Sequence, residues 1–266
     1  MKLTFLSMRS SSHGNCYYLG LPDCHLLIDA GIAFSHIRRS LKDMDLDISQ
    51  INAVLVTHDH SDHIKTVGSL SDKYNIPIYA TRPVIAGINK SVYVKHPPIS
   101  SYVIIEKEKE FAIRSFLVTA FEVPHDASDC VGYLIETPGH TFVFASDMGY
   151  ITPTASKYIA RANHLVIEAN YDIDMLQHGV YPQQLKERVG GSMGHLSNQE
   201  TAEYLANHYS PHLKDIWLCH LSGDNNLPEL AYKTISERLL QSGIRTGEDV
   251  NLSVLNRTKP SELWHS

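Results

Sequence analysis

Four candidate metal ligands fall within six consecutive residues, directly after a short apolar run. The run is residues 53–56, and the segment 58–63 that follows it reads His-Asp-His-Ser-Asp-His. In an extended segment residues two apart point the same way, so His58 and His60 can bind one cation from a single strand end. Asp62 and His63 follow where the chain turns into a helix, and they can face a second cation. Without a cation, so many imidazoles and carboxylates would leave buried polar groups unsatisfied, so we interpret the segment as a metal site rather than as a polar loop.

Length and composition are those of one folded unit. The chain has 266 residues, of which 43% are hydrophobic and 20% charged, so we expect a single domain over residues 1–266. No apolar run reaches the roughly 18 residues of a membrane span, and the first residues lack the pattern of a secretion leader. We therefore expect a cytoplasmic protein without a membrane partner, and its oligomeric state stays open. The cysteines form no C-x-x-C pair, so we interpret them as reduced core residues.

Charge is distributed unevenly along the chain. The formal net charge is -6, which disfavours non-specific coating of nucleic acid. Residues 73–105 nevertheless contain no acid and four bases, Lys73, Arg82, Lys90 and Lys95, interleaved with tyrosines. Such a stretch is typical of a nucleic-acid-facing surface with aromatic stacking groups, and also of solvated lysines beside core tyrosines.

Strands and helices are expected in both halves of the chain. Apolar, β-rich runs predict strands at residues 3–8, 16–20, 25–28, 53–56, 131–136, 141–146, 165–168, 216–219 and 252–255. Helical spacing predicts helices at residues 34–44, 65–74, 82–88, 155–162, 182–188, 197–207 and 228–241. Ser197 and Glu200 form a capping-box signal at the start of the helix 197–207. The pattern predicts an α/β fold of two facing mixed sheets with helices on the outside.

The segment 58–63 resembles the HxHxDH signature of the metallo-β-lactamase fold. Three further strand-end segments resemble the remaining motifs: His125 stands at the place of the third histidine, Asp147 at that of a carboxylate bridging two metals, and His220 at that of the last histidine. The resemblance spans nearly the whole chain and implies a four-layer αβ/βα sandwich with the metals at one edge. It also implies two ligand sets that share Asp147, namely His58, His60 and His125, and Asp62, His63 and His220.

Two other motifs resemble particular branches of this superfamily. His195 precedes the helix 197–207 and resembles the extra, non-ligand histidine of phosphodiesterase and nuclease branches. Residues 10–16 resemble the SGSxGN opening of the YycJ (WalJ) subfamily, with Ser11 where glycine is usual. Segments 168–172 and 220–226 also resemble that subfamily. Glu168 is either an acid that orients a ligand or a strand-end carboxylate in an ordinary hydrogen bond.

His140 and His13 are the other histidines to be weighed as ligands. The segment 137–141 resembles a Thr-Pro-Gly-His-Thr motif that carries a metal histidine in thioester hydrolases and lactonases of the same fold. His140 lies only seven residues before Asp147, however, and the Pro-Gly pair before it indicates a hairpin turn. We therefore do not expect His140 to be a ligand, whereas His13 lies in a loop that could reach the site.

Nitrogen and oxygen ligands suit zinc, with manganese and iron as alternatives. Two such cations can hold a hydroxide and stabilise the attacking and leaving atoms of a phosphoryl displacement. We expect a phosphodiester hydrolase with two divalent metal ions, in which Asp62 orients the nucleophile and His195 donates a proton. The resemblance implies a DNA exonuclease, with DNA favoured over RNA as the partner. The alternatives are a metal-dependent hydrolase of a small ester, thioester, lactone, β-lactam or cyclic phosphodiester, and a non-catalytic nucleic-acid-binding or redox scaffold.

Overall fold

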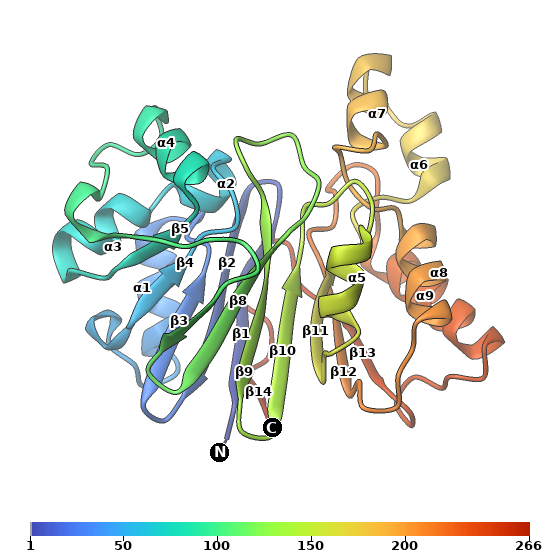
Figure 1. The fold of residues 1–266 in the computed structure, drawn as a ribbon. Helices are drawn as coiled ribbons and strands as arrows, with labels where there is room; N and C mark the ends of the chain where they lie inside the picture. Colours follow the sequence, from blue (N-terminus) through green and yellow to red (C-terminus); the bar gives the residue numbers. More distant parts are fainter. Residues whose placement is uncertain (1) are drawn as a thin grey trace.

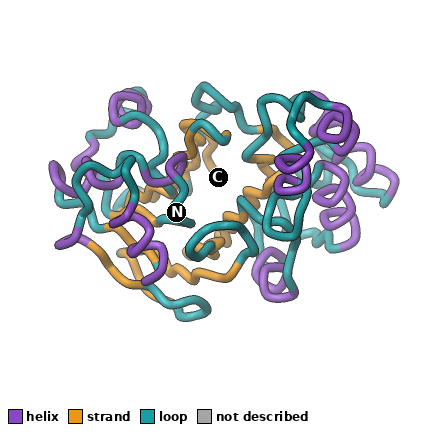
Figure 2. Tube along the Cα trace, turned by 90° about the horizontal axis from the view of Figure 1, so that it is seen from above, coloured by secondary structure: helices purple, strands orange, loops and turns teal. Residues whose placement is uncertain are grey.

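A computed structural model of the chain describes residues 2–266. Its strands form two seven-stranded sheets that face each other, with helices on the outer sides of both (Figures 1 and 2). The first sheet contains β1 (Thr4–Ser11), β2 (Gly14–Leu21), β3 (Cys24–Ile28), β4 (Ala53–Leu55), β5 (Ile78–Ala80), β6 (Tyr102–Ile104) and β14 (Trp264–His265), in the order β14-β1-β2-β3-β4-β5-β6. The second contains β7 (Glu110–Ile113), β8 (Phe116–Glu122), β9 (Val131–Thr137), β10 (His140–Ala145), β11 (His164–Glu168), β12 (Asp215–Cys219) and β13 (Asn251–Val254), in the order β13-β12-β11-β10-β9-β8-β7.

Each sheet is mixed. In the first sheet β1, β2 and β3 pair antiparallel, whereas β3, β4, β5 and β6 pair parallel. In the second, β10 to β13 are parallel and β7 to β10 antiparallel. The helices are α1 (Phe34–Lys42), α2 (Ser61–Ile64), α3 (Val67–Tyr74), α4 (Arg82–Lys90), α5 (Pro153–Ile159), α6 (Ile173–His178), α7 (Gln183–Val189), α8 (Asn198–Asn207) and α9 (Pro228–Gln241). This arrangement confirms the predicted α/β sandwich of two facing mixed sheets.

Three apolar layers hold the sandwich together. Successive strand residues point to opposite faces, so Leu26 and Ile28 of β3 lie in the core between the sheets, while Leu27 packs under the outer helices. The central layer is rich in aromatic side chains, for example Tyr17 against Phe144, with ring centroids 4.7 Å apart. One outer layer packs α1, α3 and α4 on the first sheet, and the other packs α5, α8 and α9 on the second. The result is four layers of secondary structure.

The expected elements all occur, with shifted ends. The helix expected at 155–162 begins earlier, at Pro153, because the Thr152 side chain accepts a hydrogen bond from Ala155 N and proline suits a first helical turn. The capping box of Ser197 and Glu200 forms as predicted. No sequence pattern predicts the strands β5, β6, β7, β8 and β14 or the helix α6. All of these except β8 have six residues or fewer, too short for a clear period.

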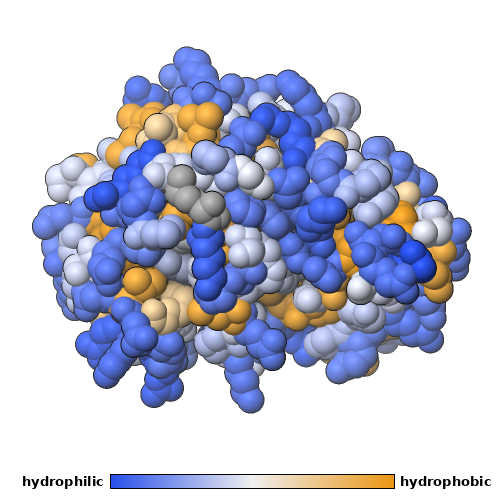
Figure 3. Space-filling model, turned by 90° about the horizontal axis from the view of Figure 1, so that it is seen from below, coloured by the Kyte–Doolittle hydropathy of each residue, from blue (hydrophilic) through white to orange (hydrophobic). Residues whose placement is uncertain are grey.

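The surface is mostly polar on the face near the termini, and the cysteines are buried. The end of the molecule near the termini is mostly hydrophilic, with apolar side chains in separate patches (Figure 3). Among residues 2–266, no helix combines the length and apolar character needed to cross a membrane. The four cysteines are free and buried, and burial raises the pKa of the Cys24 thiol to about 11. They are therefore unreactive core residues, as expected.

Candidate metal centre

The predicted site residues gather at one edge of the sandwich. Strand β4 of the first sheet leads into His58, while in the second sheet β10 leads into Asp147, β11 ends at Glu168 and β12 leads into His220. Because the carboxyl ends of parallel strands meet at the same edge of a sheet, the last three side chains lie close together. Both sheets therefore supply residues to one cluster.

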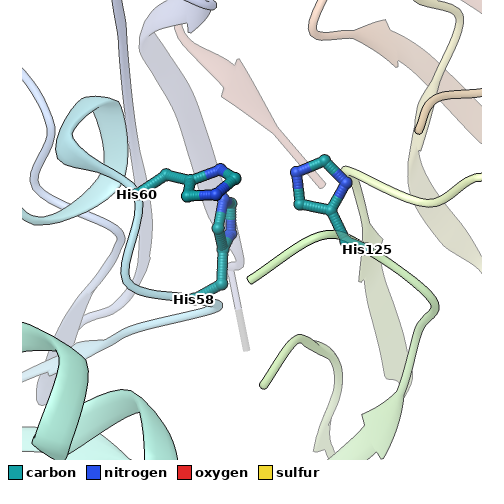
Figure 4. A group of neighbouring side chains, drawn as sticks. All are labelled: His58, His60 and His125. Atoms are coloured by element: carbon teal, nitrogen blue, oxygen red, sulfur yellow. The ribbon is translucent and has the colours of Figure 1, made fainter. Parts of the chain in front are cut away.

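The first predicted ligand set converges on one point (Figure 4). His58 and His60 come from the loop between β4 and α2, and His125 comes from the loop between β8 and β9 of the other sheet. One ring nitrogen from each lies within 4.8 Å of the other two. His58 and His125 are buried, whereas the His60 side chain is 32% exposed. This set can hold a cation on the side of the cluster where His60 reaches solvent.

The second set, Asp62, His63 and His220, lies beside the first. Its candidate ligand atoms also fall within 4.8 Å of one another. Asp147 lies between the sets, with Oδ1 4.0 Å from His125 Nε2 and Oδ2 3.6 Å from His63 Nε2. The structure thus brings together every residue that was predicted as a ligand, and Asp147 lies beside both sets, because its Oδ1 is also 3.3 Å from His220 Nδ1.

The backbone at two of these residues is unusual. Asp147 and His220 both adopt a left-handed φ of 56°. For residues other than glycine this conformation costs about 1–3 kcal/mol and concentrates at functional sites, where surrounding contacts hold it in place. Here Ser146 Oγ donates to Asp147 Oδ2, and the His220 backbone N–H donates to Ser10 Oγ. Ser10 belongs to the N-terminal motif, and the neighbouring Ser11 ends β1 in extended backbone.

Hydrogen bonds to one ring nitrogen leave the other free to bind a metal. His63 donates from Nδ1 to Asp29 Oδ2 at 2.8 Å, which puts the lone pair of the ring on Nε2, and Asn15 Nδ2 lies 2.9 Å from that nitrogen. His125 donates from Nδ1 to the Gly194 carbonyl, which leaves Nε2 as the acceptor. His60 donates from Nε2 to the Asp126 carbonyl, so its acceptor is Nδ1.

Two buried nitrogens fit a metal ion better than any other partner. Among the described residues His58 Nε2 and His220 Nε2 have no hydrogen-bond partner, although both are buried. Burial and the neighbouring His63, His125 and His60 rings hold the pKa of His58 well below its usual value, so this ring is neutral, as a metal ligand must be. His220 differs: burial disfavours its charge, but Asp147 and other carboxylates raise its pKa to about 10. Carboxylates that favour a proton there also favour a metal cation.

His195 and Glu168 stand next to the ligand sets. His195 Nδ1 donates to Glu168 Oε1 at 2.8 Å, and the same oxygen lies 3.1 Å from His220 Nδ1. Burial opposes the charge of Glu168, but the adjacent His195 and His220 rings hold its pKa below the usual value. Glu168 therefore contacts both a predicted ligand and His195, which favours the hypothesis that it orients a ligand. It also accepts from the backbone N–H of Met148.

The two other histidines belong to none of the candidate ligand groups. His140 begins β10 at the turn after Thr137, where its ring contacts His164 (Nδ1 to Nε2 3.0 Å) at the opposite end of the strand from Asp147. The expected hairpin turn at Pro138 and Gly139 is confirmed. His13 is exposed in the turn between β1 and β2, and its neighbour Ser12 lines the cleft instead.

Two functional side chains were missed by the sequence analysis. Asp29 is fully buried and accepts from Thr57 N, Thr57 Oγ1 and His63 Nδ1, each at 2.8 Å. Asn15 holds the other nitrogen of His63 and lies 3.3 Å from Asp62 Oδ2. Asp29 directly follows an apolar strand that pairs parallel with β4, which was a usable signal.

The cluster opens into a cleft of about 210 Å³. It is lined by residues of both ligand sets, by His195, and by Tyr181, Leu185 and Arg188 from the segment around α7. Arg188 forms an ion pair with Asp126, with 2.5 Å between Nε and Oδ2. The cleft therefore combines candidate metal ligands, a histidine and a cationic side chain.

The basic stretch 73–105 does not form one continuous surface. Lys73 Nζ lies 5.3 Å from the centre of the Phe34 ring, and Tyr79 stacks on Phe111 against the core between the sheets. Lys90 and Tyr93 instead line a hollow beside the metal cleft. The interpretation as core tyrosines therefore holds for Tyr79, whereas a nucleic-acid-facing role for Lys90 and Tyr93 stays a prediction.

Comparisons with known proteins identify similar sequences and folds. Residues 25–213 match the Beta-lactamase superfamily domain. The chain is 32% identical over 265 residues to Exodeoxyribonuclease YycJ of Bacillus anthracis, with 100% of both chains covered. It is 34% identical over 242 residues to Exodeoxyribonuclease WalJ of Streptococcus pneumoniae, covering 91% of this chain and 90% of that protein. The crystal structure of the metallo-beta-lactamase fold protein YhfI from Bacillus subtilis has the same fold, with a TM-score of 0.76 at 18% identity over 100% of both chains.

Proposed function

The chain belongs to the beta-lactamase superfamily and, within it, to the family of the YycJ and WalJ exodeoxyribonucleases, and on this premise we propose that it is a DNA exonuclease with two divalent metal ions. It is a hydrolase that depends on divalent metal ions. The observation that carries the proposal is the pair of ligand sets joined by Asp147, with His195 beside them in one cleft.

Two sets of residues would hold the metals. His58, His60 and His125 form one set, and the other is Asp62, His63 and His220, with Asp147 shared. Zinc is the proposed metal because the donors are imidazole nitrogens and carboxylate oxygens, without thiolates. When bound, two such cations supply an activated water and stabilise charge on a phosphoryl group.

The remaining chemistry belongs to side chains of this chain. Asp62 is 19% exposed and lines the cleft, so its carboxylate can accept a hydrogen bond from the attacking water and orient it. Glu168 holds His195 through Nδ1, which leaves Nε2 as the nitrogen available to a bound phosphate. From there His195 donates to a phosphate oxygen or protonates the leaving alkoxide, a contribution of about 10²- to 10⁴-fold.

Several observations favour DNA as the substrate and the cytoplasm as the compartment. The relatives that match over 91% or more of the chain are named exodeoxyribonucleases, and Arg188, paired with Asp126, lines the cleft where a polyanion would pass. His140, the residue that resembles the lactonase and thioesterase motif, lies away from the ligand sets. Free, buried cysteines agree with a reducing compartment.

Digestion of end-labelled substrates tests the proposal. Single- and double-stranded DNA and RNA of one sequence are incubated with protein of known zinc or manganese content. We expect mononucleotides to be released stepwise from one end of DNA, and slower or no release from RNA. Asp147→Ala, purified in the same way, is the control for a contaminating nuclease. Hydrolysis of an aryl phosphodiester without DNA cleavage, or equal activity in the control variant, would contradict the proposal.

A further inference from the structure

A second hollow, of about 530 Å³, adjoins the metal cleft. We call it the α4 groove: it is lined by His60 and Asp62 of the motif segment, by Lys90 and Tyr93 at and after the end of α4, and by Arg188. His60, Asp62 and Arg188 also line the metal cleft, so the two hollows lie side by side. A chain-like substrate whose reacting group sits in the cleft can therefore extend into the α4 groove.

A glycine in α4 allows this helix to pack closely against the segment 58–63. A Cβ atom on Gly87 would lie 1.7 Å from Asp59 Oδ2, so only glycine lets the helix approach the segment this closely. In Figure 1 α4 stands beside α2, the helix that carries Asp62 and His63. Lys90 follows Gly87 by three residues and so lies on the same face of the helix. Lys90 lines the same hollow as the predicted ligands His60 and Asp62.

The free groups of the α4 groove suit a nucleic acid strand. Tyr93 is 60% exposed, and Lys90 is exposed as well. The carboxylates at the groove are already engaged: Asp59 accepts from the Ser128 backbone N–H and hydroxyl, and Asp62 faces His63. An exposed aromatic ring next to a lysine is a typical stacking platform for the bases of a single strand, with the phosphates held by the cation.

We propose that the α4 groove binds the DNA strand on one side of the scissile phosphate, with a base stacked on Tyr93 and a phosphate held by Lys90. The proposal rests on the proposed function, because it takes the substrate to be DNA. It further specifies a single-stranded or frayed segment, since a stacking ring needs an unpaired base face.

Kinetics on long and short substrates test this proposal. The long substrate is single-stranded DNA of about 16 nucleotides, the upper end of the site sizes seen in single-strand-binding grooves, and the short one is a dinucleotide. Tyr93→Ala should raise KM for the long DNA by about 5- to 100-fold, the effect of losing one stacked base, and should lower kcat much less. Tyr93→Phe should restore the wild-type KM. Lys90→Ala should reduce the slope of log KM against log salt by about one.

Matched variants outside the groove serve as controls. Lys73→Ala removes the same charge from the same acid-free stretch, but its ammonium group lies over Phe34. Tyr232→Ala removes a tyrosine that is 41% exposed on α9. Neither should change the ratio of long-substrate to short-substrate kcat/KM. If Tyr93→Ala and Lys90→Ala keep the wild-type ratio and salt slope on DNA that the wild type cleaves, the groove proposal is wrong while the nuclease proposal stands. A wild type that cleaves no DNA overturns both.

Discussion

The substitution Asp29→Asn tests whether Asp29 sets the tautomer of the predicted ligand His63. Asp29 is buried and lines neither the cleft nor the α4 groove, yet its Oδ2 accepts from both His63 Nδ1 and Thr57 Oγ1. Its left-handed φ of 58° is one that asparagine also tolerates, so the substitution keeps both shape and backbone. If the amide oxygen keeps its bond to Thr57 N, the amide NH₂ faces His63 Nδ1, and two donors oppose each other.

His63 can relieve that conflict only by moving its proton. With the proton on Nε2, the ring loses the lone pair that would bind a metal. Loss of the hydrogen-bond partner of a metal-binding histidine lowers the metal affinity about 10- to 100-fold, or by about 1.4–2.8 kcal/mol. We therefore expect the metal held by the His63 set to bind about 10- to 100-fold more weakly in Asp29→Asn.

Competition with a chromophoric chelator measures this affinity. Asp45→Asn is the matched control, because Asp45 also has a left-handed φ, of 57°, but lies on the surface next to α1. The control should bind both ions as the wild type does. Wild-type affinity for both ions in Asp29→Asn would refute the assignment of Asp29 as the group that sets the His63 tautomer.

Three further predictions concern catalysis and stability. His195→Ala should keep both metals and lose about 100-fold or more in kcat/KM on a phosphodiester; near-full activity would remove His195 from the mechanism. Tyr133→Phe should lower the free energy of unfolding by about 1–3 kcal/mol in urea titrations, because the Tyr133 hydroxyl donates to the buried Val56 carbonyl at 2.6 Å; Tyr232→Phe, on the surface, should not. Metal removal by a chelator should lower Tm, and added zinc should restore it, since ions that bind the native state stabilise it; an unchanged Tm would mean that no metal is bound.

Local patterns were enough to predict much of this molecule. Ligands at strand ends, such as His58 and Asp147, follow directly from an apolar run and so are visible in the sequence. The same holds for the capped start of α8 at Ser197. Each of these features depends on residues a few positions apart, which is the range over which periodicity and capping act.

Features that depend on distant segments could not be predicted. The Gly194 carbonyl accepts a hydrogen bond from His125 Nδ1 across 69 residues and so fixes the tautomer of that ring. No sequence pattern near either residue predicts this contact. Short strands such as β5, with three residues, exist because their neighbours pair with them. Asp29 is an intermediate case: its place after an apolar strand was visible, but its bond to His63 needed the parallel pairing of β3 with β4.

The number of divalent ions per chain, measured by mass spectrometry of the metals after equilibration with zinc and desalting, tests the central claim most directly. The ligand sets predict two ions in the wild type. They predict one ion in His125→Ala and one in His220→Ala, because each change removes a ligand from a different set. Fewer than two ions in the wild type, or two in either variant, would contradict a centre built from these two sets.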